Sequence, residues 1–200
     1  MTDTPTSLSA LDAIFGRRSV RDYARRKIDD QTVRALLDAA VAAPTAMHME
    51  PWTFVVVQDE AMLKRYSDRA KASWVKEAKK YRDLHAPAAA GGFAARLADP
   101  SFSIFYNAGT LIVICAKPMG PFVTADCWLA AENLMLAACA LGLGTCCIGS
   151  AVPALNTAEA KTELHIPADV SVVVPIVVGI PAGGAVEAPR KDPEILLWKK

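Results

Sequence analysis

The sequence lacks a strong net charge, since 22 Lys and Arg residues balance 21 Asp and Glu residues and leave a formal charge of +1 over 200 residues. A protein that binds nucleic acid or an anionic membrane through its overall field needs a much larger positive excess. We therefore expect no nucleic-acid or membrane partner. A small anionic ligand, held by a local group of side chains, suits this composition better.

Long apolar runs are also missing, because no stretch approaches the roughly 20 apolar residues that span a bilayer. The first ten residues are polar and lack the basic-then-apolar order of a secretory signal. These features predict a soluble, cytoplasmic protein. No linker rich in Gly, Ser or Pro divides the chain, so we expect one domain over residues 1–200.

The five cysteines show no C-x-x-C spacing and no partnering histidines. They therefore indicate neither a disulfide framework nor a zinc site, and we expect no metal. The adjacent Cys146 and Cys147 could form a redox couple, although their apolar surroundings favour buried thiols. Ser-His-Asp order, paired carboxylates and a G-x-G-x-x-G after a strand are absent, which argues against hydrolase and Rossmann functions. We assign no catalytic side chain.

Hydrophobic periodicity predicts helices and strands that alternate around one sheet, in an α/β or α+β pattern. Expected helices precede Gly16, follow Asp29, follow Asp59, and cover residues 125–141 and 157–165. The helix over 125–141 is predicted to be the longest and, being apolar on nearly every face, to be central to the domain or to a subunit interface. Expected strands cover residues 52–57, 110–116, 146–149 and 170–178.

Two segments do not fit this alternation. Residues 71–103 mix a charged helical stretch with small residues and aromatics, and we expect a variable, mobile cover over a ligand. The tail over residues 181–200 ends in the apolar run I-L-L-W at 195–198, which is too apolar for a disordered terminus. We expect this tail to dock on a partner subunit, and a hydrophobic content of 52% also favours a second subunit.

Three arginines and a serine lie within five residues in R-R-S-V-R, residues 17–21, directly after the first predicted helix. Arginine presents a planar fork of N–H donors, so several arginines that converge with a hydroxyl can hold a dianionic phosphate. Cations also gather after helix C-termini, because the helix dipole is negative there. The cluster alone leaves both interpretations open.

Four segments, taken in their order along the chain, resemble the nitroreductase family of flavin mononucleotide (FMN) enzymes. Each is a weak signal alone, but order and spacing make the match specific from about residue 11 to residue 198. The segments are R-R-S-V-R-D-Y (17–23), A-P-T-A-M-H-M-E-P-W (43–52), G-L-G-T-C-C-I-G (142–149) and V-P-I-V-V-G-I-P (174–181), the last followed by Arg190 and Glu194.

The resemblance implies an α+β fold with a central, mostly antiparallel sheet flanked by helices, and a domain shared across a homodimer. It also implies roles for the basic residues. Arg17, Ser19 and Arg190 would surround the FMN phosphate, with Arg18 nearby. Arg21 would place a cation beside the reduced ring and raise its potential, whereas the plainer alternative is a surface salt bridge with Asp22.

Further cofactor contacts follow from the same resemblance. The turn at Ile148 and Gly149 would present backbone N–H groups to the flavin ring, since glycine lets the main chain approach closely. A second group would run beside the pyrimidine end of the ring and consists of Pro44, Thr45 and Ala46.

Two residues depart from the family pattern. His48 stands where the family usually has Asn, and Glu50 stands where it usually has Gln. The resemblance implies that these positions touch or orient the flavin. A carboxylate in place of a neutral amide could weaken binding of an anionic reduced flavin or alter the potential.

The function implied is that of an FMN-dependent oxidoreductase, a homodimer with two flavin sites at its interface. NADH or NADPH would deliver hydride to the flavin and leave, and a nitroaromatic, quinone or similar conjugated acceptor would then take the electrons in a ping-pong mechanism. Two alternatives are a flavin carrier or redox sensor with little turnover, and a specialised flavin dehydrogenase or dehalogenase of the same fold.

Overall fold

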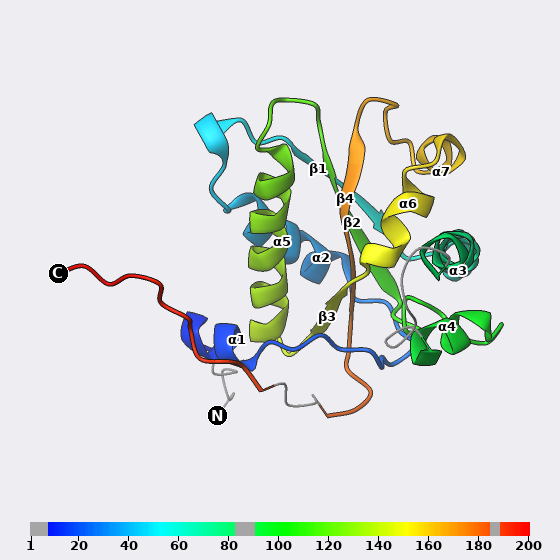
Figure 1. The fold of residues 1–200 in the computed structure, drawn as a ribbon, viewed down its shortest axis with the longest axis horizontal. Helices are drawn as coiled ribbons and strands as arrows, with labels where there is room; N and C mark the ends of the chain where they lie inside the picture. The colour runs from blue at the N-terminus through cyan, green and yellow to red at the C-terminus, as the bar shows by residue number, and fades with distance from the viewer. Residues whose placement is uncertain (1–7, 83–90, 185–188) are drawn as a thin grey trace.

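The computed structural model describes residues 8–82, 91–184 and 189–200. Helices flank a four-stranded antiparallel sheet whose strands lie in the order β1-β2-β4-β3 (Figure 1). This arrangement confirms the α+β class and the antiparallel sheet that the resemblance implied. The strands are β1 (Trp52–Val57), β2 (Thr110–Ala116), β3 (Gly144–Cys147) and β4 (Ser171–Gly179).

The bounds of β1 and β2 agree with the sequence prediction, and β4 is shifted by one residue. The predicted bounds of β3 are wrong, because the strand begins at Gly144, which pairs with Gly179 of β4. A Cβ on Gly144 would lie 2.7 Å from Val20 Cγ2, so only glycine allows the preceding chain to pass this close. A long-range contact therefore decides where this strand begins.

Nine helical segments surround the sheet in the part of the chain that the structure describes. They are α1 (Ala10–Gly16), α2 (Asp30–Val41), the 3₁₀ turn η1 (Ala46–His48), α3 (Glu60–Arg82), α4 (Gly91–Ala98), α5 (Val123–Ala140), the 3₁₀ turn η2 (Gly149–Ala151), α6 (Val152–Leu155) and α7 (Ala158–Glu163). None of the described helices is long and apolar enough to cross a membrane.

The prediction of the longest helix is wrong, because α3 has 23 residues and α5 has 18. The charged stretch from Lys71 onward continues α3 rather than starting a separate cover. Helix α4 begins at Gly91, where small residues indicated a break. Residues 83–90 lie outside the described part of the chain, and the mobile cover over 71–103 stays a prediction.

Helices cover both faces of the sheet, because side chains of a strand alternate between its two faces. Ile112 and Ile114 of β2 pack with α2 and α5, whereas Leu111 and Val113 pack with α3, α6 and α7. Figure 1 shows α2 and α5 on one side of the sheet and the other three helices on the opposite side. The helix α5 has seven buried residues, which confirms that it is central to the domain.

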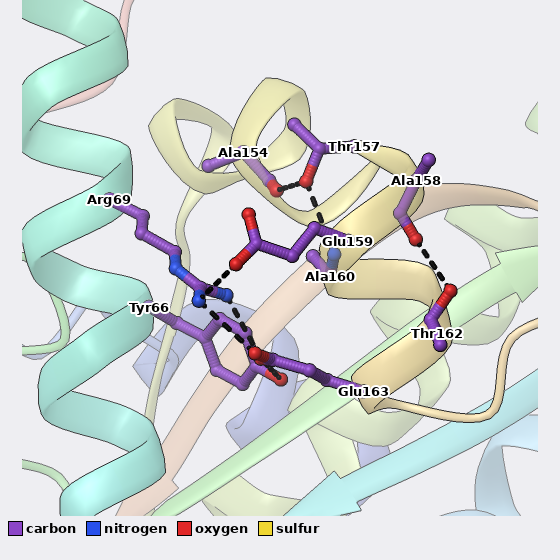
Figure 2. A network of polar contacts seen from close by, with 9 residues as sticks. All are labelled: Tyr66, Arg69, Ala154, Thr157, Ala158, Glu159, Ala160, Thr162 and Glu163. Atoms are coloured by element: carbon purple, nitrogen blue, oxygen red, sulfur yellow. Dashed lines mark hydrogen bonds and ion pairs between the residues drawn. The ribbon is translucent and has the colours of Figure 1, made fainter.

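A polar network joins α3 to α7 at the outer surface (Figure 2). Arg69 Nη1 donates to Glu163 Oε2 at 2.9 Å, and Arg69 Nη2 donates to Glu159 Oε1 at 2.8 Å. Tyr66 Oη donates to Glu163 Oε2 at 3.0 Å. The Arg69 guanidinium holds the pKa of Glu163 below its usual value, helped by the Tyr66 hydroxyl. The network is complete within one chain.

Candidate flavin site

After α1 ends, the segment over residues 17–24 runs as extended chain along the β3 side of the sheet. Val20 N–H donates to the Thr145 carbonyl at 2.9 Å, and Ala24 N–H donates to the Ile180 carbonyl at 3.0 Å. Isolated bridges pair Ser19 with Thr145 and Tyr23 with Pro181. Backbone pairing therefore fixes the arginine cluster against the end of the sheet.

Arg17 is the residue of this cluster with an unsatisfied buried donor. Its Nε is buried and makes no hydrogen bond within the described chain. Glu132 Oε1 on α5 lies 3.4 Å away and forms an ion pair outside hydrogen-bonding geometry. A buried donor without an acceptor is unfavourable, so the Arg17 Nε is an unsatisfied polar group at this position.

Arg18 has a different role. Its Nη1 donates to the carbonyls of Phe15 at 2.6 Å and Arg17 at 2.8 Å, which lie at the end of α1. Cations that bond the last carbonyls stabilise a helix C-terminus. The helix-end interpretation of the cluster therefore applies to Arg18, and the phosphate interpretation remains for Arg17, Ser19 and Arg21.

Ser19 and Arg21 are exposed beside β3. Burial raises the pKa of the Cys146 thiol, and the positive charges of Arg21 and Arg17 act on the same thiol in the opposite direction. Among the described residues, no ion pair joins Arg21 to Asp22, which was the alternative role for Arg21. Arg17 and Arg21 therefore converge on the same strand end.

The adjacent thiols cannot act as a couple in this strand. Cys146 packs in the core cluster beneath α3, whereas Cys147 packs in the cluster beneath α5, so the two side chains lie on opposite faces of β3. Burial raises the pKa of Cys147 to about 11 and also raises the pKa of Cys146. Protonated, buried thiols are poor nucleophiles, so they serve as core residues.

The turn after β3 offers one of the two predicted backbone donors. Ile148 N–H already donates to the Pro175 carbonyl at 2.8 Å, so this group belongs to the sheet. Gly149 begins η2, and the first N–H groups of a helix have no partner within it. Nothing lies within 4 Å of the position that a Cβ on Gly149 would occupy. A planar ligand can therefore approach the main chain at Gly149.

The loop over residues 44–51 is strained. Met47, His48 and Glu50 have φ angles of 52°, 54° and 46°, a left-handed region that residues other than glycine seldom adopt. His48 Nε2 lies 3.4 Å from Glu50 Oε1, and both side chains are exposed. The two residues that depart from the family pattern therefore pair with each other.

Asp126 anchors this loop, and sequence reasoning did not assign it a role. Asp126 is only 4% exposed and lies in the first turn of α5, where the helix dipole favours a carboxylate. Asp126 Oδ1 accepts a hydrogen bond from Ala46 N–H at 3.1 Å. An acidic residue on an otherwise apolar helix was the signal that could have revealed it.

A single chain brings only part of the predicted site together. Ser19 pairs with Thr145 in β3, the strand that leads to the turn at Gly149, and Arg17 pairs with Glu132 in the middle of α5. The loop with Pro44, Thr45 and Ala46 instead contacts Asp126 in the first turn of α5. Arg190 is exposed in the extended tail. Residues 195–198 of that tail are also exposed, and Figure 1 shows the chain leaving the domain beyond α1.

Comparison with known proteins gives a consistent result. The model of the nitroreductase family matches residues 14–180. The chain belongs to the nitroreductase family. It is 32% identical over 177 residues to a protein of Archaeoglobus fulgidus named "Putative NADH dehydrogenase/NAD(P)H nitroreductase", with 86% of this chain and 84% of the relative covered.

Solved nitroreductases share the fold. A Bacteroides fragilis nitroreductase crystallised with bound FMN is 28% identical, with a TM-score of 0.79 over 96% of this chain and 100% of that one. An FMN-dependent nitroreductase from Clostridium difficile is 27% identical, with a TM-score of 0.70 over 94% and 99% of the two chains. The resemblance seen in the sequence is confirmed as membership of the family.

The residues of this nitroreductase fit a phosphorylated flavin. The buried Arg17 Nε lacks a hydrogen bond, the Ser19 hydroxyl is exposed nearby, and the main chain is open at Gly149. Arg17 and Ser19 supply hydrogen-bond donors for an anion, and Gly149 allows a ligand to approach the main chain closely. The family match ends at residue 180, so it leaves out Arg190 and the tail.

Proposed function

We propose that this nitroreductase-family chain is an FMN-dependent oxidoreductase that uses NAD(P)H to reduce nitroaromatic, quinone or similar conjugated acceptors. The proposal is carried by the Arg17 Nε without a hydrogen bond, in a segment that pairs with β3 ahead of the open turn at Gly149. The names of the relatives, which mention FMN and NAD(P)H, point the same way.

Each group has a distinct task in this proposal. Arg17 and Ser19, joined by Arg190 when the tail is in place, hold the phosphate through charge-assisted hydrogen bonds, which are roughly twice as strong as neutral ones. Gly149 N–H donates to the ring edge. Arg21 keeps a positive charge near the ring and favours its negatively charged reduced form. Bound FMN supplies the two-electron chemistry, so no side chain needs to act as a nucleophile.

We further propose a homodimer in which the partner subunit supplies the loop over residues 44–50. That loop contacts Asp126 in the first turn of α5, whereas Arg17 pairs with Glu132 further along the same helix, and we infer that one chain does not complete the ring's surroundings. Contiguous exposed apolar side chains mark interaction surfaces. Here they occur on α1, on α5 and in the tail, and include Leu11, Ile14, Phe15, Trp128, Leu129, Ile195, Leu196, Leu197 and Trp198.

The test begins with the purified protein incubated with FMN and then freed of unbound flavin. The proposal expects a yellow protein whose flavin absorbance bleaches rapidly when NADH or NADPH is added without oxygen. A protein that stays colourless defeats it. A yellow protein that neither nicotinamide reduces is a flavin carrier or sensor instead.

Steady-state kinetics with a panel of acceptors then define the reaction. Parallel lines in double-reciprocal plots are expected when NAD(P)H and a quinone or nitroaromatic are varied, because the two substrates use one site in turn. Intersecting lines contradict the ping-pong mechanism. Turnover confined to a halogenated phenol shows a specialised dehalogenase.

A further inference from the structure

A cavity of about 520 Å³ lies away from every residue proposed to hold the flavin. It opens to solvent and is lined by the segment over residues 25–27, by one face of the first turns of α3, and by the loop over residues 100–109. Ligand sites in proteins commonly have volumes of about 300–1,000 Å³. The cavity is therefore large enough for a small organic molecule.

The first wall of the cavity is fixed by polar contacts. Gln58 Nε2 donates to the Ile28 carbonyl at 2.8 Å and to Thr110 Oγ1 at 2.9 Å, while Ile28 N–H donates to the same Thr110 oxygen at 3.3 Å. A Cβ on Gly109 would lie 2.5 Å from the backbone of Arg26, so the backbones of these two segments are in direct contact. The basic segment cannot move freely.

The opposite wall is held by a buried lysine. Lys71 is 7% exposed, and its Nζ donates to the carbonyls of Phe102 at 2.8 Å and Asp99 at 3.3 Å. The same ammonium pairs with Asp68 at 3.1 Å. Ser67 Oγ accepts a hydrogen bond from Ile104 N–H at 3.0 Å. The cavity is preorganised, which lowers the entropic cost of binding.

The charge of the lining is positive. Arg25, Arg26 and Lys27 are exposed and form no ion pair with a described residue, whereas Lys64 is neutralised by Asp68 at 2.7 Å. Glu60 is the one remaining carboxylate of the lining. The floor is apolar and includes Leu63, Phe102 and Phe105.

We propose that this cavity binds a small aromatic carboxylate, with its carboxylate at the basic segment and its ring on the apolar floor. Arginine matches a carboxylate with two parallel N–H donors, and an aromatic ring gains from contact with the side chains of Leu63 and Phe102. Three free cations against one free carboxylate disfavour a cationic ligand. The inference does not depend on flavin binding.

The experiment titrates the FMN-incubated protein with benzoate, acetate and inorganic phosphate, and follows backbone amide shifts by NMR. Benzoate is expected to give saturable shifts at Arg26, Lys27 and Leu63 and to bind more tightly than acetate or phosphate. Its binding should weaken as salt rises from about 0.02 M to about 0.2 M, because salt screens the basic segment. Equal binding of phosphate and benzoate overturns the proposal.

A charge-matched pair of variants sharpens the test. The double variant R26Q/K27Q is expected to bind benzoate at least about fivefold more weakly, on the scale of one or two exposed charged contacts. The control R34Q/K117Q removes the same charge from exposed positions outside the cavity and should bind as the wild type does.

Three outcomes contradict the assignment. The first is the absence of saturable shifts in the wild-type protein. The second is equal weakening by both double variants, which would reflect net charge alone. The third is displacement of FMN by benzoate, or loss of benzoate binding in R17A, which would place the ligand at the arginine cluster. The wild-type shifts decide the question even if a variant fails to fold.

Discussion

The two sides of this domain differ in how completely their polar groups are paired and their apolar side chains are covered within one chain. On the α3 side, Arg69 pairs with two carboxylates of α7 and Tyr66 completes the network (Figure 2). On the α5 side, Arg17 keeps a buried N–H without a hydrogen bond, and Phe15 is 72% exposed. The Arg69 network is complete within the chain, whereas the α5 side has an unsatisfied donor and apolar surface left for a ligand and a partner.

This difference has a physical reason. Buried polar groups without partners cost free energy and are rare in folded chains, and contiguous exposed apolar surface marks sites of interaction. Substitutions in the Arg69 network should therefore change the stability of the folded chain. Substitutions on the α5 side should change assembly and flavin binding and leave the isolated fold nearly unaltered.

The largest expected effect is that of F15D on the proposed dimer. A carboxylate in an apolar contact costs several kcal/mol, so dimer affinity should fall at least about a hundredfold. Sedimentation equilibrium measures the change. The control A158D places the same charge at the exposed start of α7 and should leave assembly unchanged. A wild-type protein that is monomeric at micromolar concentration contradicts the dimer itself.

The next effect is that of R17A on FMN affinity. Loss of one charged hydrogen bond should weaken FMN binding by about 1.5–3 kcal/mol. A fluorescence titration with FMN measures this loss, and the melting temperature of the flavin-free protein should stay nearly constant. An equal loss of flavin-free stability would show that Arg17 is structural, held by Glu132 alone.

A smaller effect, on the stability of the folded chain, is expected for Y66F in the Arg69 network. The substitution removes the hydroxyl that donates to Glu163 but keeps the buried ring, so the free energy of unfolding should fall by about 1 kcal/mol. Urea denaturation of the flavin-free protein measures it. FMN affinity should stay unchanged, and a parallel loss of FMN affinity would show that the two sides are coupled.

The smallest effect is on pH dependence. Arg69 lowers the pKa of Glu163 in the folded chain, so the pair stabilises the protein above the pKa of the unfolded glutamate, about 4.3, and this stability is lost as pH falls through the lower folded value. Urea midpoints between about pH 6 and about pH 3 should therefore fall less steeply in E163Q than in the wild type. Identical slopes would mean that the pair contributes nothing.

Much of the site was visible in local sequence patterns, and some of it was not. The arginine cluster, the Gly149 turn and the strand over 52–57 follow from short motifs and period-two hydrophobicity. The helix-end role of Arg18 and the sheet pairing of Ile148 N–H depend on backbone carbonyls whose positions no motif gives. The length of α3 was missed because its charged face hid the helical repeat.

The sequence by itself determined the family, the α+β class and the candidate phosphate residues, because these depend on residue types at fixed spacing along the chain. Only the tertiary structure decided that the Arg17 Nε is buried beside Glu132, that Asp126 holds the loop at Ala46, and that these two contacts lie at different positions along α5. Such contacts join residues about eighty or more positions apart, and packing of α5 against both segments, rather than local pattern, brings them together.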